Sequence, residues 1–460
     1  MSQNNNTSSP HVLALPYPSQ GHINPMIQFC RRLSSKGVKV SLALTNFISN
    51  TLKPRSDGHV SLVTISDGYD EGGFTEAGSV DTYLDRLKTI GSSSLGQVIE
   101  DHVGTSHPIT CLVYDAFLPW ALDIARVKGV CGAAFFTQAC LVNYVYYLVY
   151  HKRLDLPIVK TPVEIRGLPL LEMRDLPSFV DSLGSYPGYL KLVLEQNCNL
   201  DKADFVLVNT CYELEKEVTD AMSKECPLLT IGPTVPSFYL DKRIDFDKDY
   251  GLNLYHIDAN HTTACITWLN SKPPRSVVYV SFGSMACLPV EQMEELALGL
   301  KQSAFDFLWV VRQCEMDKLP MGFIDEVVNK GLIVTWTEQL EVLANESIGC
   351  FFTHCGWNST LEALALGVPM VGMPQWTDQP TDAKLVEDVW KVGVRVKVGE
   401  NGVVKREEIV KCIIEVMEGD TRLNFAENAK YWKDLARNAV CEDGSSDKNI
   451  NQFVSKISSS

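Results

Sequence analysis

Polar side chains that could hold an anion gather in HCGWNSTLEALALGVPMVGMPQWTDQ, residues 354–379. An apolar run ends at His354, a turn follows, and a helical pattern starts at Asn358. The first N–H groups of a helix lack partners within the helix, and the helix dipole places positive charge there. Such a start binds anions. With His354, Trp357 and Ser359 beside it, the pattern predicts a diphosphate site that needs no metal.

Structural interpretations of the same residues stay open. Ser359 and Glu362 have the spacing of a capping box, in which the two side chains satisfy backbone N–H groups at a helix start. The remaining positions can also be structural, as a strand-end histidine, core aromatic rings or an ordinary helix start: His354, Trp336, Trp357, Asp378 and Gln379. Taken singly, none of these residues is specific for a ligand.

A second group of residues could act as a base. His22 lies in the loop after the apolar run 11–17, and Asp115 ends the apolar run 109–115. Histidine titrates near neutral pH, and a carboxylate on its far ring nitrogen would fix the tautomer and stabilise the charged ring. The alternatives are a structural loop histidine and an N-cap for a helix that begins near Pro119.

These residues require a frame of parallel strands. Apolar runs at 11–17, 38–44 and 109–115 alternate with helical patterns, and a second alternating series starts at SVVYVSFGS, residues 276–284. The first helix is expected to start at Pro25 and to end at Gly37. Strand, helix, strand is a βαβ unit, which implies a parallel sheet. We therefore predict an α/β fold with two doubly wound, Rossmann-like domains facing each other across a cleft. Both polar groups would line the cleft, because ligands sit at the carboxyl ends of such strands.

The length of 460 residues also favours two domains, since it exceeds what one hydrophobic core supports. A stretch rich in Pro, Gly and charge follows Gly232 and is the best candidate for a linker. We expect an N-terminal domain at 1–240, a linker at 241–255 and a C-terminal domain at 256–440. A terminal helix at 441–460 is expected to pack back on the N-terminal domain.

The composition excludes several classes of protein. The formal net charge is -15, and the chain has no long basic run, so nucleic acid is not an expected partner. No apolar run reaches the roughly 18 residues of a membrane helix. The polar start MSQNNNTSSP lacks the pattern of a signal peptide, and 14 cysteines without a CxxC pair are typical of reduced thiols, so we expect a cytoplasmic protein. Metal-ligand spacing is also missing, and we expect a monomer.

The segment from Trp336 to Gln379 closely resembles the 44-residue donor-binding signature of plant family 1 UDP-sugar glycosyltransferases. The resemblance covers the whole chain, because PSQGHINP, YDAFLPW, FFTQAC, GPTVPSFYLDKR, SVVYVSFGS and GSSDKNI follow in the order of the family's landmarks. The last three are most similar to the subgroup that acts on small acids and isoprenoids such as steviol, triterpenoids and steroids. The resemblance implies a GT-B fold that binds the acceptor in the N-terminal domain and the UDP-sugar in the C-terminal domain.

The resemblance also implies roles for individual residues. The uracil and ribose would be held by Trp336, the backbone of Thr337, Gln339 and Glu362. The diphosphate would be held by Gly283, Ser284, His354, Asn358 and Ser359. The sugar would be held by Trp357, Asp378, Gln379 and, from the other domain, Thr137. Glutamine at 379 favours glucose over galactose, and the catalytic pair would be His22 and Asp115.

The chain departs from the family's pattern at four positions. Thr337 and Glu338 replace the usual second and third residues of the signature, and Asn270 stands where Asp is common. Pro380 follows Gln379 directly and should restrict that residue away from helical backbone angles.

The activity implied is that of a UDP-glucosyltransferase, a hexosyltransferase that uses UDP-glucose as donor and needs neither metal nor cofactor. An acceptor hydroxyl attacks the anomeric carbon, His22 takes its proton, and inversion gives a β-glucoside; a carboxylic acid gives a glucose ester. An apolar, aromatic N-terminal domain suits a lipophilic acceptor, a terpenoid or steroid before a phenolic. The acceptor is expected at Phe117, Trp120, Gln138, Asn143 and Tyr147.

Three rival functions can be compared with this one. A nicotinamide dehydrogenase needs G-x-G-x-x-G after a strand, and the chain contains no G-x-G. A binder of nucleotide sugars or hormones would have no need for His22 and Asp115. A transferase that extends an existing sugar stays open, because it would differ only in the residues around the acceptor.

Overall fold

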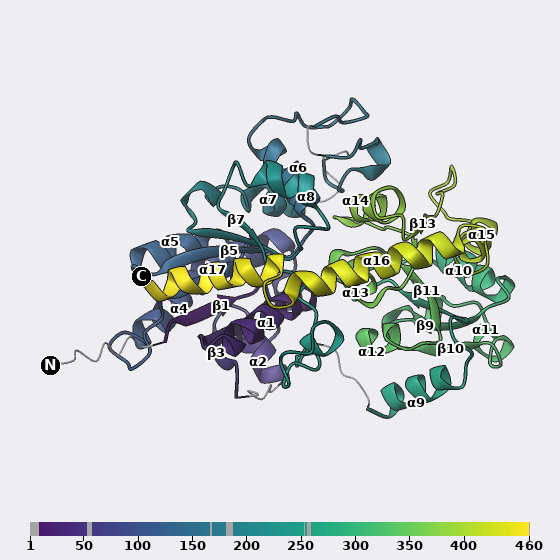
Figure 1. Cartoon of the computed structure of the whole chain (residues 1–460), viewed down its shortest axis with the longest axis horizontal. Coiled ribbons are helices and arrows are strands. Elements are labelled where there is room, and N and C mark those ends of the chain that lie inside the picture. Colours follow the sequence, from purple (N-terminus) through teal and green to yellow (C-terminus); the bar gives the residue numbers. More distant parts are fainter. Residues whose placement is uncertain are drawn as a thin grey trace. The chain divides into compact units, whose positions relative to one another are not determined.

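The computed structural model describes residues 9–52, 58–165, 168–180, 187–252, 254 and 259–459. The chain forms two compact units (Figure 1), which are described separately below. Unit 1 comprises Met1–Leu170, Phe179–Leu254 and Asn438–Ser460, and unit 2 comprises Leu171–Ser178 and Tyr255–Arg437.

Unit 1 is built on a parallel sheet of seven strands within the described residues, in the order β3-β2-β1-β4-β5-β6-β7. The strands are β1 (His11–Leu15), β2 (Lys39–Thr45), β3 (Ser61–Ile65), β4 (Cys111–Asp115), β5 (Cys131–Phe136), β6 (Phe205–Val208) and β7 (Leu228–Thr230). The helices are α1 (Gln20–Ser35), α2 (Asn46–Leu52), α3 (Phe74–Ala77), α4 (Val80–Asp101), α5 (Trp120–Val127), α6 (Cys140–Tyr150), α7 (Pro187–Glu195), η2 (Leu200–Lys202), α8 (Lys216–Met222), η3 (Ser237–Tyr239) and α17 (Ser445–Ser459). Strands β1 and β4 are buried throughout, as expected for a parallel sheet covered on both faces.

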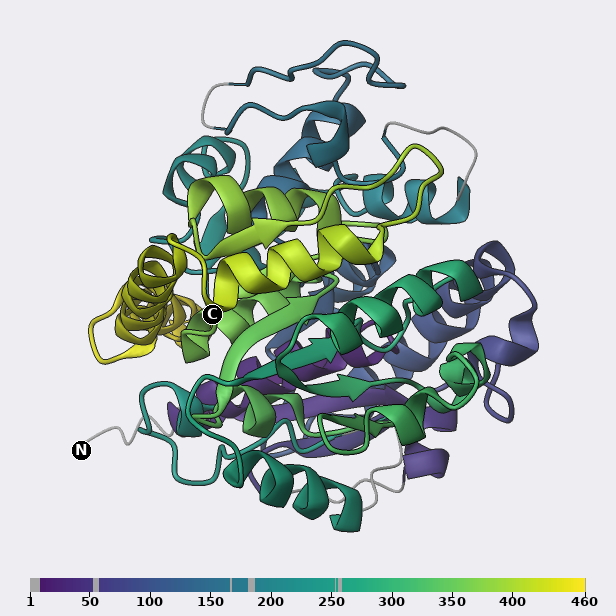
Figure 2. The ribbon, with the colours of Figure 1, turned by 90° about the vertical axis from the view of Figure 1, so that its right-hand side faces the viewer.

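Unit 2 has a parallel sheet of six strands within the described residues, in the order β10-β9-β8-β11-β12-β13. The strands are β8 (Val277–Ser281), β9 (Asp306–Val310), β10 (Gly331–Val334), β11 (Ile348–Thr353), β12 (Met370–Gly372) and β13 (Gly393–Arg395). The helices are η1 (Met173–Asp175), α9 (Ala259–Asn270), α10 (Val290–Gln302), η4 (Gln313–Lys318), α11 (Phe323–Glu326), α12 (Gln339–Leu343), α13 (Trp357–Leu366), α14 (Gln379–Lys384), η5 (Leu385–Val389), α15 (Arg406–Met417) and α16 (Arg422–Val440), which ends in unit 1. Figure 2 shows green helices on both sides of the green strands. The predicted fold class of two doubly wound α/β units is confirmed.

Each sheet has one point where the strand order reverses. In unit 1 this point lies between β1 and β4, and in unit 2 it lies between β8 and β11. The loops that leave neighbouring strands at such a point run in opposite directions, which opens a crevice at the carboxyl ends of the strands. His22 follows β1, Asp115 ends β4, and His354 follows β11, so the predicted site residues lie at these two points.

The start of α1 differs from the sequence prediction. The helix begins at Gln20, so His22 lies in its first turn rather than in a loop, and Pro25 lies inside the helix. The sequence pattern favoured a helix start at Pro25, because proline suits the first position of a helix. The first turn therefore fixes the backbone of His22 more firmly than a loop would.

The stretch expected to be a linker at 241–255 is packed against α1. The Asp247 carboxylate is fully buried and lies 3.1 Å from Arg31 Nη1, and Asp241 lies 3.1 Å from Arg32 Nη1. Its charged residues suggested exposure, but two of them are the buried partners of arginines on a helix more than 200 positions earlier. Asn253 and Tyr255 in this stretch lie outside the described residues.

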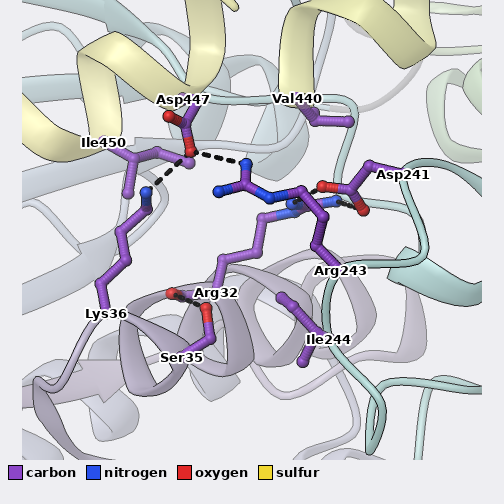
Figure 3. Close-up of a pocket in the computed structure, with 9 residues that line it drawn as sticks. All are labelled: Arg32, Ser35, Lys36, Asp241, Arg243, Ile244, Val440, Asp447 and Ile450. Atoms are coloured by element: carbon purple, nitrogen blue, oxygen red, sulfur yellow. Dashed lines mark hydrogen bonds and ion pairs between the residues drawn. The ribbon is translucent and has the colours of Figure 1, made fainter. Parts of the chain in front are cut away.

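The last helix, α17, contributes to the core of unit 1. Asp447 accepts from Lys36 Nζ at 2.7 Å and lies 3.4 Å from Arg243 Nη1, around a small cavity (Figure 3). Phe453 is fully buried, and its ring centroid lies 5.9 Å from that of Phe29 on α1. Residues from both ends of the chain therefore stabilise the same unit.

Candidate active site

His22 and Asp115 form a hydrogen-bonded pair in unit 1. His22 Nδ1 lies 2.7 Å from Asp115 Oδ2, and the two side chains are 15% and 1% exposed. The other carboxylate oxygen, Oδ1, accepts the backbone N–H of Phe117 at 3.0 Å. A carboxylate only accepts hydrogen bonds, so Nδ1 carries the proton and Nε2 holds the lone pair. The ring is thereby oriented and prepared to accept a proton at Nε2.

Aromatic side chains surround this imidazole. The ring of Phe117 lies 4.8 Å from that of His22 between centroids, and the ring of Tyr17 lies 5.2 Å away. Burial, reinforced by Tyr189 and Asp115, raises the pKa of Tyr17 well above its ordinary value, so its hydroxyl keeps its proton. Tyr17 was not among the predicted site residues. Its position at the end of the apolar run 11–17 was the available signal.

His354 lies at the reversal point of the sheet in unit 2, directly after β11. A Cβ added at Gly283 would lie 2.8 Å from His354 Nε2, and one added at Gly356 would lie 2.6 Å from the same atom. Only glycine therefore lets both loops approach the ring so closely. Burial lowers the pKa of His354 to about 4, against the opposing effects of Asp378 and the backbone of Ser281. The ring is therefore neutral at pH 7.

Helix α13 begins at Trp357 with Gly356 as its N-cap, and this excludes the capping box. If Ser359 were the N-cap, the helix would begin at the residue after it. Ser359 instead lies inside the first turn of the helix. Its hydroxyl oxygen instead accepts a hydrogen bond from Gln339 Nε2 at 2.9 Å. The carboxylate of Glu362 accepts a second hydrogen bond from the same nitrogen at 2.7 Å. Because the glycine N-cap has no side chain to cap the first turn, this start is of the type that binds anions, and the diphosphate site expected here stays a prediction.

The first turns of α13 and α14 are connected by Asp378. The backbone N–H of Trp357 donates to Asp378 Oδ2 at 3.3 Å. The Trp357 side chain is 2% exposed, and its ring centroid lies 6.0 Å from that of Trp390, so this side chain packs in the interior. Gln379 Oε1 accepts the backbone N–H of Gln375 at 2.8 Å and that of Trp376 at 3.1 Å.

Three of the four departures have a local explanation. Thr337 is 6% exposed, so its side chain belongs to the interior, while Trp336 before it is partly exposed. Asn270 accepts a hydrogen bond from Asn345 at 2.8 Å. The expected effect of Pro380 is wrong, because Gln379 is the first residue of α14 and proline fits the first turn. Nothing in the structure explains Glu338.

A residue that was not among the predicted site residues binds the loop after β8. Gly283 has a left-handed φ of 72°, and Arg312 Nη1 donates to the backbone oxygen of Ser284 at 2.7 Å. Sequence reasoning missed Arg312, which follows FLWVV at the end of the neighbouring strand β9.

The expected acceptor residues are brought together only in part. Phe117 contacts His22. Thr137, which was expected to bind the sugar rather than the acceptor, also lies here, with its Oγ1 3.3 Å from His22 Nδ1. Asn143 is fully buried and donates to the backbone oxygen of Gln138 at 3.0 Å. Tyr147 donates its hydroxyl to Glu225 at 3.2 Å. Trp120, the fifth expected acceptor residue, lies at the start of α5 and is 9% exposed.

The described part of the chain contains no group of three or more His, Cys, Asp or Glu side chains placed to hold a metal ion. Within the same residues, none of the helices has both the length and the apolar character needed to cross a membrane.

Two doubly wound units, one with a His–Asp pair and one with an anion-type helix start, are typical of glycosyltransferases of the GT-B class. A family model described as UDP-glucoronosyl and UDP-glucosyl transferase matches residues 243–429. The chain is 55% identical over 453 residues to UDP-glycosyltransferase 74F2 of Arabidopsis thaliana, with 98% of each chain covered. It is 55% identical over 451 residues to flavonol 7-O-beta-glucosyltransferase UGT74F1 of the same plant, with 97% of this chain and 98% of the relative covered.

A solved structure gives the same result. Os79 from O. sativa in complex with UDP matches with a TM-score of 0.92 at 41% identity, covering 97% of this chain and 100% of the other. The chain therefore belongs to the plant family 1 UDP-glycosyltransferases. It is an enzyme that transfers a sugar from a UDP-sugar to a small-molecule acceptor.

Proposed function

We propose that this enzyme transfers glucose from UDP-glucose, with inversion, to a hydroxyl or carboxyl group of a lipophilic small molecule. The observation that carries the proposal is the His22–Asp115 pair, in which Asp115 orients the ring through Nδ1 and leaves Nε2 to accept a proton. A binding protein would gain nothing from an oriented base.

The proposed step is one displacement. The acceptor O–H gives its proton to His22 Nε2 as its oxygen attacks the anomeric carbon from the face opposite UDP. The bond between that carbon and the diphosphate oxygen breaks, and UDP leaves with the electron pair. Asp115 stabilises the imidazolium that results. The chemistry requires the acceptor oxygen to meet His22 and the anomeric carbon together.

The donor is assigned to unit 2 in this proposal. The first turn of α13 and the neutral His354 hold the diphosphate, together with the loop at Gly283 and Ser284, because backbone N–H groups and a neutral imidazole donate without adding charge. Asn358 and Ser359 are assigned to the diphosphate as well. Uracil and ribose are assigned, as the resemblance implies, to Trp336, Thr337, Gln339 and Glu362, and the sugar to Trp357, Asp378, Gln379 and Thr137.

A terpenoid or steroid acceptor is favoured over a phenolic in this proposal. The apolar wall of Tyr17 and Phe117 beside the base supports a lipophilic acceptor with one polar attachment point. Besides the flavonol enzyme, the relatives of this chain include Mogroside I-E synthase of Siraitia grosvenorii, which is 45% identical to it, and Crocetin glucosyltransferase 2 of Crocus sativus, which is 46% identical. The second candidate is a transferase that extends an existing glycoside.

The test combines a donor and acceptor panel with a base variant. The protein is incubated with UDP-glucose, UDP-galactose or UDP-glucuronate and with diverse aglycones and glycosides, and products are identified by mass. Glucosides of lipophilic aglycones support the proposal, products only from glycosides favour the sugar-extending candidate, and binding of UDP-glucose without turnover overturns both.

His22→Ala separates base catalysis from donor binding. We expect turnover with an alcohol acceptor to fall about 100- to 10,000-fold, whereas an ionised carboxylic acid suffers less because it has no proton to lose. UDP-glucose binding, measured by calorimetry, should be retained. His102→Ala is the matched control, since His102 lies against His11 at the opposite end of β1. Unchanged turnover of the alcohol in His22→Ala would refute the base assignment.

A further inference from the structure

A short segment, residues 171–178, leaves unit 1 and belongs to unit 2. Unit 1 continues on both sides of this segment, up to Leu170 and again from Phe179. The segment contains η1 (Met173–Asp175), in which the backbone N–H of Glu172 donates to Asp175 Oδ2 at 3.0 Å. None of these residues entered the sequence-based prediction of the site.

Asp175 attaches this segment to α14 and β13. Its carboxylate is 1% exposed and lies 2.9 Å from Arg395 Nη1 and 3.4 Å from Lys384 Nζ. Its backbone oxygen accepts the hydroxyl of Thr381 at 2.7 Å, and Arg395 Nη2 also donates to the backbone oxygen of Arg174. Arg174 Nε lies 3.7 Å from Asp175 Oδ1 as a third cation. The attachment is rigid, because the buried carboxylate faces these cations while the backbone oxygen of the same residue accepts a hydroxyl of α14.

The same segment holds the turn just before α14. The backbone N–H of Ser178 donates to the backbone oxygen of Thr377 at 2.8 Å. Thr377 has a φ of 60°, a left-handed conformation that is rare and strained for a β-branched residue. Such a conformation persists only where its surroundings enforce it. The hydroxyl of Thr377 is in turn bound to Asp378 Oδ1, so the strained residue and Asp378 are held together.

We propose that Asp175 is a positioning residue for recognition of the donor sugar. It fixes the segment 171–178 on α14, and the segment keeps Thr377 in the conformation that presents Asp378 and Gln379. This inference rests on the proposed function, in which Asp378 and Gln379 bind the sugar hydroxyls. UDP has no sugar ring beyond its diphosphate, so its binding does not depend on this attachment.

The test compares UDP-glucose with UDP in Asp175→Asn. We expect kcat/KM for UDP-glucose to fall about tenfold to hundredfold, because small displacements of positioned groups cost rates of this size. The inhibition constant of UDP should stay within about twofold of the wild type. Asp388→Asn is the matched control: Asp388 is 48% exposed and pairs with the same Lys384 at 2.6 Å, yet it does not touch the segment. This control should match the wild type with both ligands.

A general structural role for Asp175 predicts a different pattern. It would lower the thermal midpoint and weaken UDP and UDP-glucose equally, and that result would overturn the proposal. Thr381→Val serves if Asp175→Asn does not fold, because it removes only the hydroxyl that donates to the backbone oxygen of Asp175. It should show the same selective effect in milder form, and equal effects on both ligands would again overturn the proposal.

A double-mutant cycle tests whether Asp175 acts through the sugar-binding turn. The affinity for UDP-glucose is measured by calorimetry for Asp175→Asn, Gln379→Ala and the combination. Residues that act as one unit give non-additive effects, so we expect the second substitution to add little to the first. Additive effects would contradict the proposal. If the wild-type protein fails to use UDP-glucose, the proposed function fails; if it does use it but Asp175→Asn leaves the two ligands equally affected, only this inference fails.

Discussion

At the scale of single residues, the contacts of Asp115 determine the orientation of His22, the proposed base. One carboxylate oxygen is held by the backbone N–H of Phe117 and the other faces His22 Nδ1. The same arrangement that orients the ring also determines which ring nitrogen carries the proton. If His22 is the base as proposed, residue 115 must be an acid and not only a hydrogen-bonding residue.

Asp115→Asn should abolish base catalysis while leaving the fold intact. The amide oxygen would accept the N–H of Phe117, so the amide N–H₂ would face His22 and force the proton onto Nε2. We expect turnover with an alcohol acceptor to fall about 100- to 10,000-fold. The KM for UDP-glucose should change little. Steady-state kinetics measure both values, with exposed Asp123→Asn as a control. Turnover close to that of the wild type would show that the tautomer does not matter.

His11 predicts how stability depends on pH. The ring is fully buried between Ser41 and the backbone of His107, and burial lowers its pKa from 6.5 to about 4. Between these values the unfolded chain binds a proton that the folded chain does not, so stability falls as the pH drops from 6.5 to 4. The full effect is about 3 kcal/mol. Urea unfolding at pH 7 and pH 4.5 should show a smaller loss for His11→Gln than for the wild type. An equal loss in both proteins would contradict this assignment.

At the scale of elements, the order of the strands determines the positions of the His22–Asp115 pair and of the loop at His354. Neither the His–Asp pair nor the His354 loop is local in sequence: β1 and β4 are separated by nearly a hundred residues, and β8 and β11 by about seventy. Their carboxyl ends meet because the order of strands reverses between them. The close approach of Gly283 and Gly356 to the His354 ring follows from the same meeting of β8 and β11.

Gly283→Ala should weaken nucleotide binding. The new Cβ would lie 2.8 Å from His354 Nε2, so the ring must move, and the left-handed φ of 72° adds strain. We expect the inhibition constant of UDP to rise about tenfold, equivalent to about 1.4 kcal/mol. Gly322→Ala is the control, because its φ is 75° but a Cβ there would meet nothing within 4 Å. Both variants carry the strain, and only Gly283→Ala should affect UDP. Equal UDP inhibition in the two variants would argue against a role of His354 in binding.

At the scale of the whole molecule, the chain passes between its two units more than once. Residues 171–178 belong to unit 2 although unit 1 surrounds them in sequence, and the chain returns to unit 1 at Asn438. Core residues of unit 1 accordingly come from both chain ends, with Phe453 of α17 packed against Phe29 and Phe205.

Phe453→Ala should destabilise unit 1. The side chain is fully buried, so its truncation leaves a cavity that costs about 3–5 kcal/mol. Chemical denaturation followed by fluorescence should show an earlier transition, whereas Gln452→Ala at the exposed neighbouring position should change stability very little. Similar stabilities for the two variants would mean that α17 is not part of the core.

Local features of this protein can be predicted from its amino-acid sequence. Apolar runs and helical periodicity predicted the alternating strands and helices, and the residue types of His22, Asp115 and the 354–379 stretch predicted the chemistry. The start of α1 was placed wrongly because proline at 25 suits a helix start, and local signals do not show that contacts extend the helix back to Gln20. The capping box failed for a related reason, since the partner of Ser359 is Gln339 on another helix.

Contacts between residues far apart in the chain could not be predicted from the sequence. Asp241 and Asp247 lie in the stretch expected to be a linker, yet their side chains are buried against Arg32 and Arg31. Asp175 lies in a stretch without any sequence signal, yet it attaches to α14. The physical reason is that periodicity and residue type act over a few neighbouring positions. The partner of a buried charge and the order of strands in a sheet depend on residues far apart in the chain, which only folding brings together.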